Sequence, residues 1–255
     1  MSVALNHRFD GPEEAPVLVL SNSLGTSLEM WDELVPALAA RFRVLRYDQR
    51  GHGHSPAPPG PYSIADLGRD ALELLDELGL QEVNLCGVSL GGMTGLWLAI
   101  NVPERIDRLG LCCTSAHMPP PEMWAERAAT ARGEGIPALA DASLERWLTP
   151  AAPQRIADRL RRGLLQTNPE AYAGCCEAIA GHDLRAELGA IRAPTLVIAA
   201  EDDPSTPPDH ARLIAGSIER ARLVVFPEGR HLVAVERPQE VGQLLLEHLT
   251  AEAAV

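Results

Sequence analysis

Residues 87–91, Gly87-Val88-Ser89-Leu90-Gly91, decide the fold that this sequence predicts. A strand-like apolar run, Val83 to Cys86, precedes them, and a helix-like run, Met93 to Ile100, follows. Cβ atoms on the two glycines would clash, so the glycines permit a tight strand-to-helix turn with Ser89 in a sparsely populated backbone conformation and its Oγ exposed. Ser89 is therefore a candidate nucleophile, and the Leu90 N–H, at the helix N-terminus, is expected to face a developing oxyanion.

Two later loops supply a candidate acid and a candidate base. The G-x-S-x-G pattern needs this support, because glycine-flanked serines also occur in ordinary turns and phosphate-binding loops. Asp203 follows the buried-strand run Thr195 to Ala199, and His231 follows the run Ala221 to Phe226. The order serine, acid, histidine is that of nucleophile-elbow enzymes. Loops outside the carboxyl ends of parallel strands open on one edge of a sheet, so the three side chains are expected to converge as a catalytic triad.

The chemistry requires all three groups. A serine hydroxyl needs a base near neutrality to remove its proton in the transition state, and His231 suits that task. A carboxylate on the far ring nitrogen would fix the tautomer and stabilise the imidazolium that forms. We assign this role to Asp203 because Pro204 restricts its backbone to extended values and begins the turn, whereas the neighbouring Asp202 could equally cap that turn.

An early strand-like run, Val17 to Leu20, leads into the small polar loop Ser21-Asn22-Ser23-Leu24-Gly25. Nucleophile-elbow enzymes take one oxyanion donor from the residue after the nucleophile and another from this early loop. The backbone N–H groups of Leu24 and Leu90 are therefore the predicted oxyanion hole. The alternative is an ordinary turn. A later loop after the strand-like run Phe42 to Tyr47, residues 48–55, is interpreted as a scaffold that braces the site.

Together these motifs resemble the α/β-hydrolase superfamily, and within it most closely the 3-oxoadipate enol-lactone hydrolases of the β-ketoadipate pathway. The superfamily resemblance rests on Gly87 to Gly91, Asp203, His231 and the stretch Asp48-Gln49-Arg50-Gly51-His52-Gly53. The family resemblance rests on Ser21-Asn22-Ser23-Leu24-Gly25-Thr26, Pro61-Tyr62-Ser63-Ile64 and Arg146-Trp147-Leu148-Thr149. Two positions depart from the pattern of the relatives: Ala200 replaces a glycine before the acid, and Leu148 replaces an aromatic residue, which could alter substrate fit.

The alternation of strands and helices predicts an α/β protein with a mainly parallel, doubly wound sheet and helices on both faces. At 255 residues and 46% hydrophobic composition, one domain over residues 1–255 can bury a single large core. No apolar run approaches bilayer length and residues 1–8 lack a secretory apolar region, so a cytoplasmic enzyme is expected. The formal charge of −13 disfavours nucleic acid and anionic membranes as partners and mildly opposes an anionic substrate.

Neither the cysteines nor the histidines predict a metal or redox centre. Five cysteines, including the adjacent pairs Cys112-Cys113 and Cys175-Cys176, fit neither a disulfide framework nor a C-x-x-C site, so we expect buried small residues. His52-Gly53-His54 lies in the brace loop without a surrounding set of carboxylates or cysteines. The predicted chemistry requires no cofactor.

The segment between the strand-like runs Leu109 to Cys113 and Thr195 to Ala199 is interpreted as an inserted helical cap at about residues 118–188. It opens with Met118-Pro119-Pro120-Pro121, and apolar positions then recur at helical spacing in 123–131, 138–147, 153–166 and 170–179. These helices are expected to roof the pocket and to select the substrate. The cap is rich in arginine, and most of its arginines are expected on solvated helix faces.

Arg146 stands apart, because Arg146-Trp147 also matches the cap motif of the resembled family. Its guanidinium could bind a substrate carboxylate bidentately, with Trp147, and Trp124 earlier in the cap, beside the substrate. The alternative is that Arg146 caps its helix and Trp147 packs as core. His117 and His182 are further possible polar contacts to substrate, although each is more often an ordinary partly buried histidine.

The resemblance implies a serine hydrolase of aromatic-compound catabolism that opens 3-oxoadipate enol-lactone, a substrate with a free carboxylate, by acyl transfer to water. Its expected partner is a small anionic lactone or ester, and the sequence is silent on oligomeric state. A general carboxylesterase, or a carbon–carbon bond hydrolase of ring-fission products, would use the same triad, and a cofactor-free perhydrolase is less favoured. A non-catalytic ligand-binding protein of the same fold is a more distant alternative.

Overall fold

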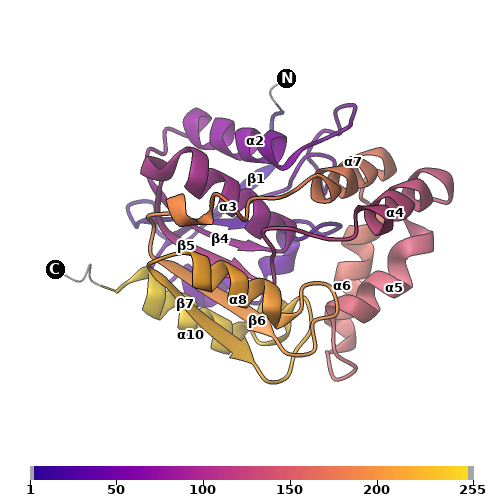
Figure 1. Ribbon diagram of the computed structural model, residues 1–255. Helices are drawn as coiled ribbons and strands as arrows, with labels where there is room; N and C mark the ends of the chain where they lie inside the picture. The colour runs from indigo at the N-terminus through magenta and orange to yellow at the C-terminus, as the bar shows by residue number, and fades with distance from the viewer. Residues whose placement is uncertain (1–2, 252–255) are drawn as a thin grey trace.

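Seven strands form one sheet in the computed structural model, which describes residues 3–251 (Figure 1). They are β1 (His7–Asp10), β2 (Val17–Ser21), β3 (Arg43–Tyr47), β4 (Val83–Val88), β5 (Ile106–Cys112), β6 (Thr195–Ala200) and β7 (Ala221–Phe226). Their order is β1-β3-β2-β4-β5-β6-β7, and each pairing is parallel except the antiparallel pairing of β1 with β3. The predicted, mainly parallel α/β sheet is therefore confirmed, with the edge strand β1 as an addition. Residues 1–2 and 252–255 of the predicted domain lie outside the described part of the chain.

The central strands are continuous apolar runs because helices cover both faces of the sheet. In β2, Leu18 and Leu20 belong to one apolar cluster, and Val19, which points to the opposite face, belongs to a second. The first cluster includes α1 (Val35–Leu38) and α10 (Pro238–Leu249), which pack against each other. The second includes α2 (Ile64–Glu77), α3 (Leu90–Asn101) and α8 (Pro208–Ser217), which lie together across the front of Figure 1. The sheet is thus the middle layer of three.

Four helices lie between β5 and β6, within or close to the predicted helical stretches. They are α4 (Pro121–Gly133), α5 (Pro137–Trp147), α6 (Gln154–Leu165) and α7 (Pro169–Ala180), and we call residues 121–180 the helical insertion. Figure 1 shows the insertion at one end of the sheet, with α4 and α7 packed together. Its two connections to the sheet meet in an isolated antiparallel bridge between His117 and Asp183. The remaining short elements are η1 (Leu28–Trp31), η2 (Pro103–Arg105), η3 (Leu188–Ala190) and α9 (Val233–Glu236).

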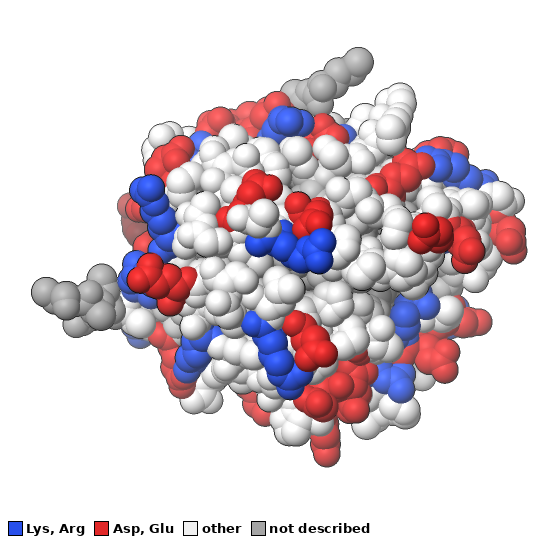
Figure 2. All heavy atoms as spheres, in the orientation of Figure 1, with Lys and Arg blue, Asp and Glu red and all other residues white. Residues whose placement is uncertain are grey.

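All five cysteines are buried free thiols, three in or just after the strands and two in α7. The 22 basic side chains are all arginines. Figure 2 shows them interspersed with acidic side chains on the visible face, with no large area of one sign. Of the helices within residues 3–251, none has the length and apolar character needed to cross a bilayer.

Candidate active site

The turn between β4 and α3 holds Ser89 at φ 56° and ψ −116°, in the left-handed region that L residues rarely adopt. A Cβ atom on Gly87 would lie 2.2 Å from the Gly91 carbonyl oxygen, and one on Gly91 would lie 2.1 Å from the Ser21 carbonyl oxygen. Backbone approaches as close as these leave no room for any side chain. The sequence-predicted elbow thus has a physical basis in two specific contacts.

Asp203 and His231 meet beyond the ends of β6 and β7. His231 Nδ1 lies 2.9 Å from Asp203 Oδ2, and both side chains are buried. Thr206 Oγ1 donates to the same carboxylate oxygen at 2.6 Å, while the backbone N–H groups of Ser205 and Thr206 donate to Oδ1 at 2.8 and 3.1 Å. The carboxylate therefore has acceptor contacts on both oxygens and can hold the imidazole in one orientation. Asp202, the rival acid, is exposed.

Asp203 stays ionised in this setting. Burial opposes ionisation, but the charge of His231 and the hydrogen bonds from His231 and Thr206 outweigh it and lower the pKa of Asp203 to about 2. Because the ionised carboxylate only accepts hydrogen bonds, the neutral form of His231 carries its proton on Nδ1 and its lone pair on Nε2. This is the tautomer that a general base requires.

The loop after β2 and the first residue of α3 each contribute a backbone donor without an acceptor in the described part of the chain. Neither the Leu24 N–H nor the Leu90 N–H has a hydrogen-bond acceptor within residues 3–251. The adjoining Gly25 N–H donates to His52 Nε2 at 2.9 Å, and His52 Nδ1 lies 3.0 Å from the Arg50 carbonyl oxygen. Since a backbone N–H can only donate, Nε2 must accept and Nδ1 must carry the proton. The brace loop predicted from the sequence thus holds the polar loop through a neutral imidazole.

A small, largely closed cavity of about 20 Å³ lies where these loops meet the insertion. Ser89, His231 and Leu24 contribute to its wall from the sheet side, and the predicted cap residues Arg146, Trp147 and Trp124 from the insertion side. Its other lining residues are Ser23, Met93, Met118, Arg127, Tyr172, Ser205 and Thr206. Ser89 is only 7% exposed and His231 4%, so the cavity is almost closed to solvent.

Two guanidinium groups converge on one buried hydroxyl in the insertion. Arg146 donates to Ser143 Oγ at 3.2 Å and Arg127 at 3.3 Å, and Ser143 is fully buried. Neither arginine forms an ion pair with any carboxylate in the described part of the chain. Burial, together with the charge of Arg127, lowers the pKa of Arg146 to about 10. The cavity wall therefore carries two positive charges that lack a counter-ion among residues 3–251.

Two aromatic residues add polar atoms to this wall. Trp124 Nε1 is buried without a hydrogen-bond partner among residues 3–251. The Tyr172 hydroxyl also lacks a partner of acceptable geometry there, although Ser143 lies near it. Arg127 stacks 5.4 Å from the Trp124 ring centroid and 5.9 Å from that of Tyr172. The donors present here outnumber the acceptors, which suits an anionic ligand.

Sequence reasoning did not select Arg127, Ser143 or Tyr172. Arg127 lies one helical turn after Trp124, and Ser143 one turn before Arg146, so spacing within each helix placed them on the same faces as residues that were selected. The convergence of α4, α5 and α7 on one point has no counterpart in the sequence pattern. Tyr172 carried no signal of its own.

His117 and His182 lie outside this cavity. His182 Nε2 is 3.1 Å from the Ser115 carbonyl oxygen and His117 Nδ1 is 3.2 Å from the His182 carbonyl oxygen, so both join the two connections of the insertion. Burial lowers the pKa of His182 to about 4. Their ordinary structural interpretation is therefore favoured over substrate contact. Within residues 3–251, no group of three or more His, Cys, Asp or Glu side chains is arranged to hold a metal ion.

Comparison with known proteins gives relatives that share one fold family. The alpha/beta hydrolase fold family matches residues 16–238. 3-Oxoadipate enol-lactonase 2 of Acinetobacter baylyi is 40% identical over 93% of this chain and 90% of its own length. The crystal structure of the enol-lactonase from Burkholderia xenovorans has a TM-score of 0.95 and 44% identity, covering 98% of this chain and 97% of that one. A thermophilic esterase from Thermogutta terrifontis, solved with malate bound, has a TM-score of 0.90 and 28% identity over 97% of this chain and 93% of that one.

Proposed function

This chain belongs to the α/β-hydrolase fold family, and from that premise we propose that it hydrolyses 3-oxoadipate enol-lactone with Ser89 as nucleophile. It is a hydrolase, and its relatives include two named enol-lactonases of Acinetobacter baylyi. One observation carries the proposal: the same cavity is lined by Ser89 and by two arginines, Arg127 and Arg146, that form no ion pair within residues 3–251. Such a cavity suits a substrate that has an acyl group at one end and a carboxylate at the other.

In the proposed acylation step, Ser89 Oγ attacks the lactone carbonyl carbon while His231 Nε2 takes the hydroxyl proton. The Leu24 and Leu90 N–H groups, which have no other acceptor in the described chain, stabilise the oxyanion. The ring carbon–oxygen bond then breaks, and His231 returns the proton to the leaving oxygen. The released enol becomes a ketone, which makes ring opening strongly downhill.

Deacylation repeats these roles with water. His231 removes a proton from a water molecule that attacks the acyl carbon, and Ser89 leaves with that proton. Asp203 keeps its charge throughout and stabilises the imidazolium formed in each half of the reaction. No step calls on a group beyond these side chains and backbone amides.

The carboxylate of the substrate would lie against Arg146 and Arg127, with Trp147 and Trp124 beside its apolar part. A guanidinium can hold a carboxylate through two parallel hydrogen bonds, which fixes the acyl group relative to Ser89. These two half-buried guanidinium groups, which have no carboxylate partner within residues 3–251, would then gain a counter-ion. The acidic surface opposes this anion only at long range, where salt screens it.

A general carboxylesterase is the second candidate. The similarity to the thermophilic esterase of Thermogutta terrifontis favours it, although that structure was solved with malate, a dicarboxylate, bound. A carbon–carbon bond hydrolase would use the same triad. A ligand-binding protein without activity is disfavoured by the intact contact between Asp203 and His231.

The deciding experiment compares kcat/KM for freshly generated 3-oxoadipate enol-lactone and for p-nitrophenyl acetate, which has no carboxylate. We expect Ser89→Ala to abolish both activities in a folded protein. Arg146→Ala and Arg127→Ala should each lower kcat/KM for the lactone by about 10- to 100-fold and leave the neutral ester nearly unchanged. Arg162→Ala is the matched control, because Arg162 is an exposed arginine on α6.

Each outcome selects one function. A strong lactone preference that both cavity arginines support would establish the enol-lactonase. Turnover of the neutral ester alone would make a general esterase the better description. Substantial activity in folded Ser89→Ala would refute the serine mechanism, and failure of Ser89 to react with a serine-directed phosphonate would revive the ligand-binding alternative.

A further inference from the structure

The loop that carries His231 is hydrogen-bonded directly to the insertion. The His231 N–H donates to the Arg146 carbonyl oxygen at 3.4 Å, and the Leu232 N–H donates to the Trp147 carbonyl oxygen at 3.0 Å. Arg230 Nη1 donates to the Leu148 carbonyl oxygen at 3.2 Å and also to that of Glu145. The proposed base and the proposed carboxylate anchor are thus parts of one bonded unit.

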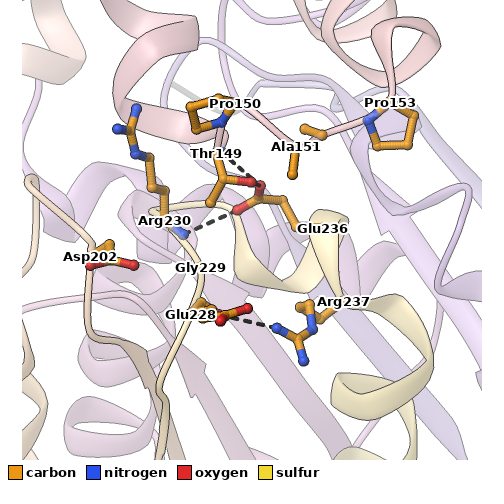
Figure 3. A pocket seen from close by; sticks show the side chains of 11 residues that line it. Thr149, Pro150, Ala151, Pro153, Asp202, Glu228, Gly229, Arg230, Glu236 and Arg237 are labelled. Carbon is orange, nitrogen blue, oxygen red and sulfur yellow. Dashed lines mark hydrogen bonds between the residues drawn. The ribbon is translucent and has the colours of Figure 1, made fainter.

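One side chain, that of Glu236, forms hydrogen bonds to both parts of this unit. Glu236, the last residue of α9, accepts from the Thr149 N–H and the Thr149 hydroxyl through Oε1, both at 2.7 Å. Its other oxygen, Oε2, accepts from the Arg230 N–H at 3.1 Å. Figure 3 shows the carboxylate between Thr149, just after α5, and Arg230, the residue before His231. A single carboxylate therefore bridges the insertion and the His231 loop.

A surface groove lies beside this carboxylate, lined by Thr149, Arg230, Glu236 and neighbouring residues. The other charged groups around the groove are engaged elsewhere or lie apart. Arg237 pairs with Glu240 at 2.6 Å and donates to the Glu228 carbonyl oxygen at 3.4 Å. Asp202 and the side chains of Glu228 and Arg230 also face the groove in Figure 3. The three donors to Glu236 are neutral, and both of its oxygens act only as acceptors. A carboxylate satisfies that requirement, whereas an amide would turn an N–H group toward one of the donors.

We propose that Glu236 is a positioning residue: it holds His231 in register with Arg146 and Trp147, so that the base and the substrate anchor keep a fixed geometry. The inference rests on the proposed function, because it takes His231 as the base. Charge-assisted hydrogen bonds are short and geometrically specific, and a misplacement of about 1 Å at a reacting group can cost about 100-fold in rate. Glu236 acts through Arg230 and Thr149 and lies outside the cavity that holds Ser89.

Three variants and a control test this role. Glu236→Ala removes every acceptor, Glu236→Gln keeps the size of the side chain but brings an amide N–H against one donor, and Thr149→Val removes one hydroxyl while keeping the backbone bond. Glu240→Gln is the matched control, because Glu240 is an exposed carboxylate nearby on α10. For each variant, the rate at which a p-nitrophenyl phosphonate modifies Ser89 is measured beside kcat and KM for p-nitrophenyl acetate and the enol-lactone.

For Glu236→Ala, we expect phosphonate modification and kcat for both substrates to fall at least about tenfold, because His231 is displaced. KM should rise only for the lactone, by about tenfold, because Arg146 moves with the same unit. Glu236→Gln and Thr149→Val should show the same pattern at about two- to tenfold, and Glu240→Gln should stay within about twofold of the wild type. A role in folding alone would lower the midpoint of thermal unfolding without this split between kcat and KM.

A folded Glu236→Ala protein that reacts with the phosphonate at the wild-type rate would overturn the inference. If Glu236→Ala does not fold, unchanged rates in both Glu236→Gln and Thr149→Val would overturn it equally. If the phosphonate fails to modify Ser89 in the wild type, the proposed function falls and takes this inference with it. If the wild type reacts and the Glu236 variants match it, the inference falls alone.

Discussion

His52 can support the loop of Leu24 only while its imidazole is neutral. Its Nε2 accepts from the Gly25 N–H, so protonation would place two N–H groups head to head. Burial lowers the pKa of His52, and this effect outweighs the hydrogen bond to the Arg50 carbonyl oxygen, which raises it. The folded protein therefore resists protonation at this site more than the unfolded chain does.

This difference makes stability depend on pH. Between the lowered folded pKa and the ordinary pKa of His52, the unfolded chain binds more protons, so the free energy of unfolding decreases as pH falls below about 6.5. We expect His52→Gln, whose side-chain oxygen can still accept a hydrogen bond, to reduce that loss. Urea unfolding at about pH 7.5 and about pH 5 measures it, with the exposed His54→Gln as control. Equal pH dependence in wild type and His52→Gln would contradict the assignment.

Asp203 gives a second prediction, in which the contribution to stability is lost at a lower pH than for His52. Asp203→Asn should lower kcat for either substrate by about 10⁴-fold. A neutral amide favours the wrong tautomer of His231 and cannot stabilise the positively charged imidazolium. In the wild type the pKa of about 2 lies below the ordinary 3.8, so the ionised carboxylate contributes stability above about pH 4 that is lost as pH falls toward 2. That contribution is on the order of 2 kcal/mol. The stability gap between wild type and variant should therefore narrow in acid, and a constant gap would argue against it.

Among the elements, the elbow between β4 and α3 tolerates the least change. Gly91→Ala would place a Cβ 2.1 Å from the Ser21 carbonyl oxygen in the neighbouring strand, so backbone must move. We expect it to destabilise the protein by about 3 kcal/mol or more and to remove activity. Gly216→Ala on α8 is the matched control, because a Cβ there meets no atom within 4 Å. It should leave stability unchanged or raise it by up to about 1 kcal/mol, as denaturant unfolding would show. A stable, active Gly91→Ala protein would refute the close approach.

How far the sequence predicted these elements depends on burial. β2, β4 and β6 are buried on both faces, so their continuous apolar runs marked them clearly. β1 escaped prediction because it is a four-residue edge strand, His7–Asp10, of mixed polar character and little burial. Its antiparallel pairing with β3 forms only in the folded chain.

The same reasoning explains which parts of the proposed site the sequence could predict. Ser89, Asp203 and His231 each follow a recognisable strand, so topology alone brings their loops to one edge of the sheet. Arg127 and Ser143 lie on separate helices, and only the packing of α4 and α5 over the cavity joins them. Glu236 looks like an ordinary helix-end carboxylate in the sequence, because its partner Thr149 is 87 residues away.

At the scale of the whole molecule, the sheet and the insertion form a nearly closed chamber around Ser89. On the face that Figure 2 shows, acidic and basic side chains are interspersed, while two half-buried arginines of the cavity wall have no carboxylate partner within residues 3–251. The proposed reaction brings a substrate to Ser89, which is only 7% exposed, so we expect part of the chamber to open. The His231 loop is bonded to the end of α5, so we expect the opening to involve α4 and α7 rather than that junction.

The buried cysteine thiols allow the rate of this opening to be measured by chemical labelling. Cys175 and Cys176 lie in α7, whereas Cys86, Cys112 and Cys113 lie in or beside the central strands. A maleimide reaches a buried thiol only during a local or global opening, so its labelling kinetics report the stability of the surrounding unit. We expect the α7 pair to be labelled well before the strand thiols under native conditions, as mass spectrometry of peptides can show. Simultaneous labelling would mean that sheet and insertion open as one cooperative unit. The labelling rates of the two sets of cysteines would therefore report separately on opening of the insertion and opening of the sheet.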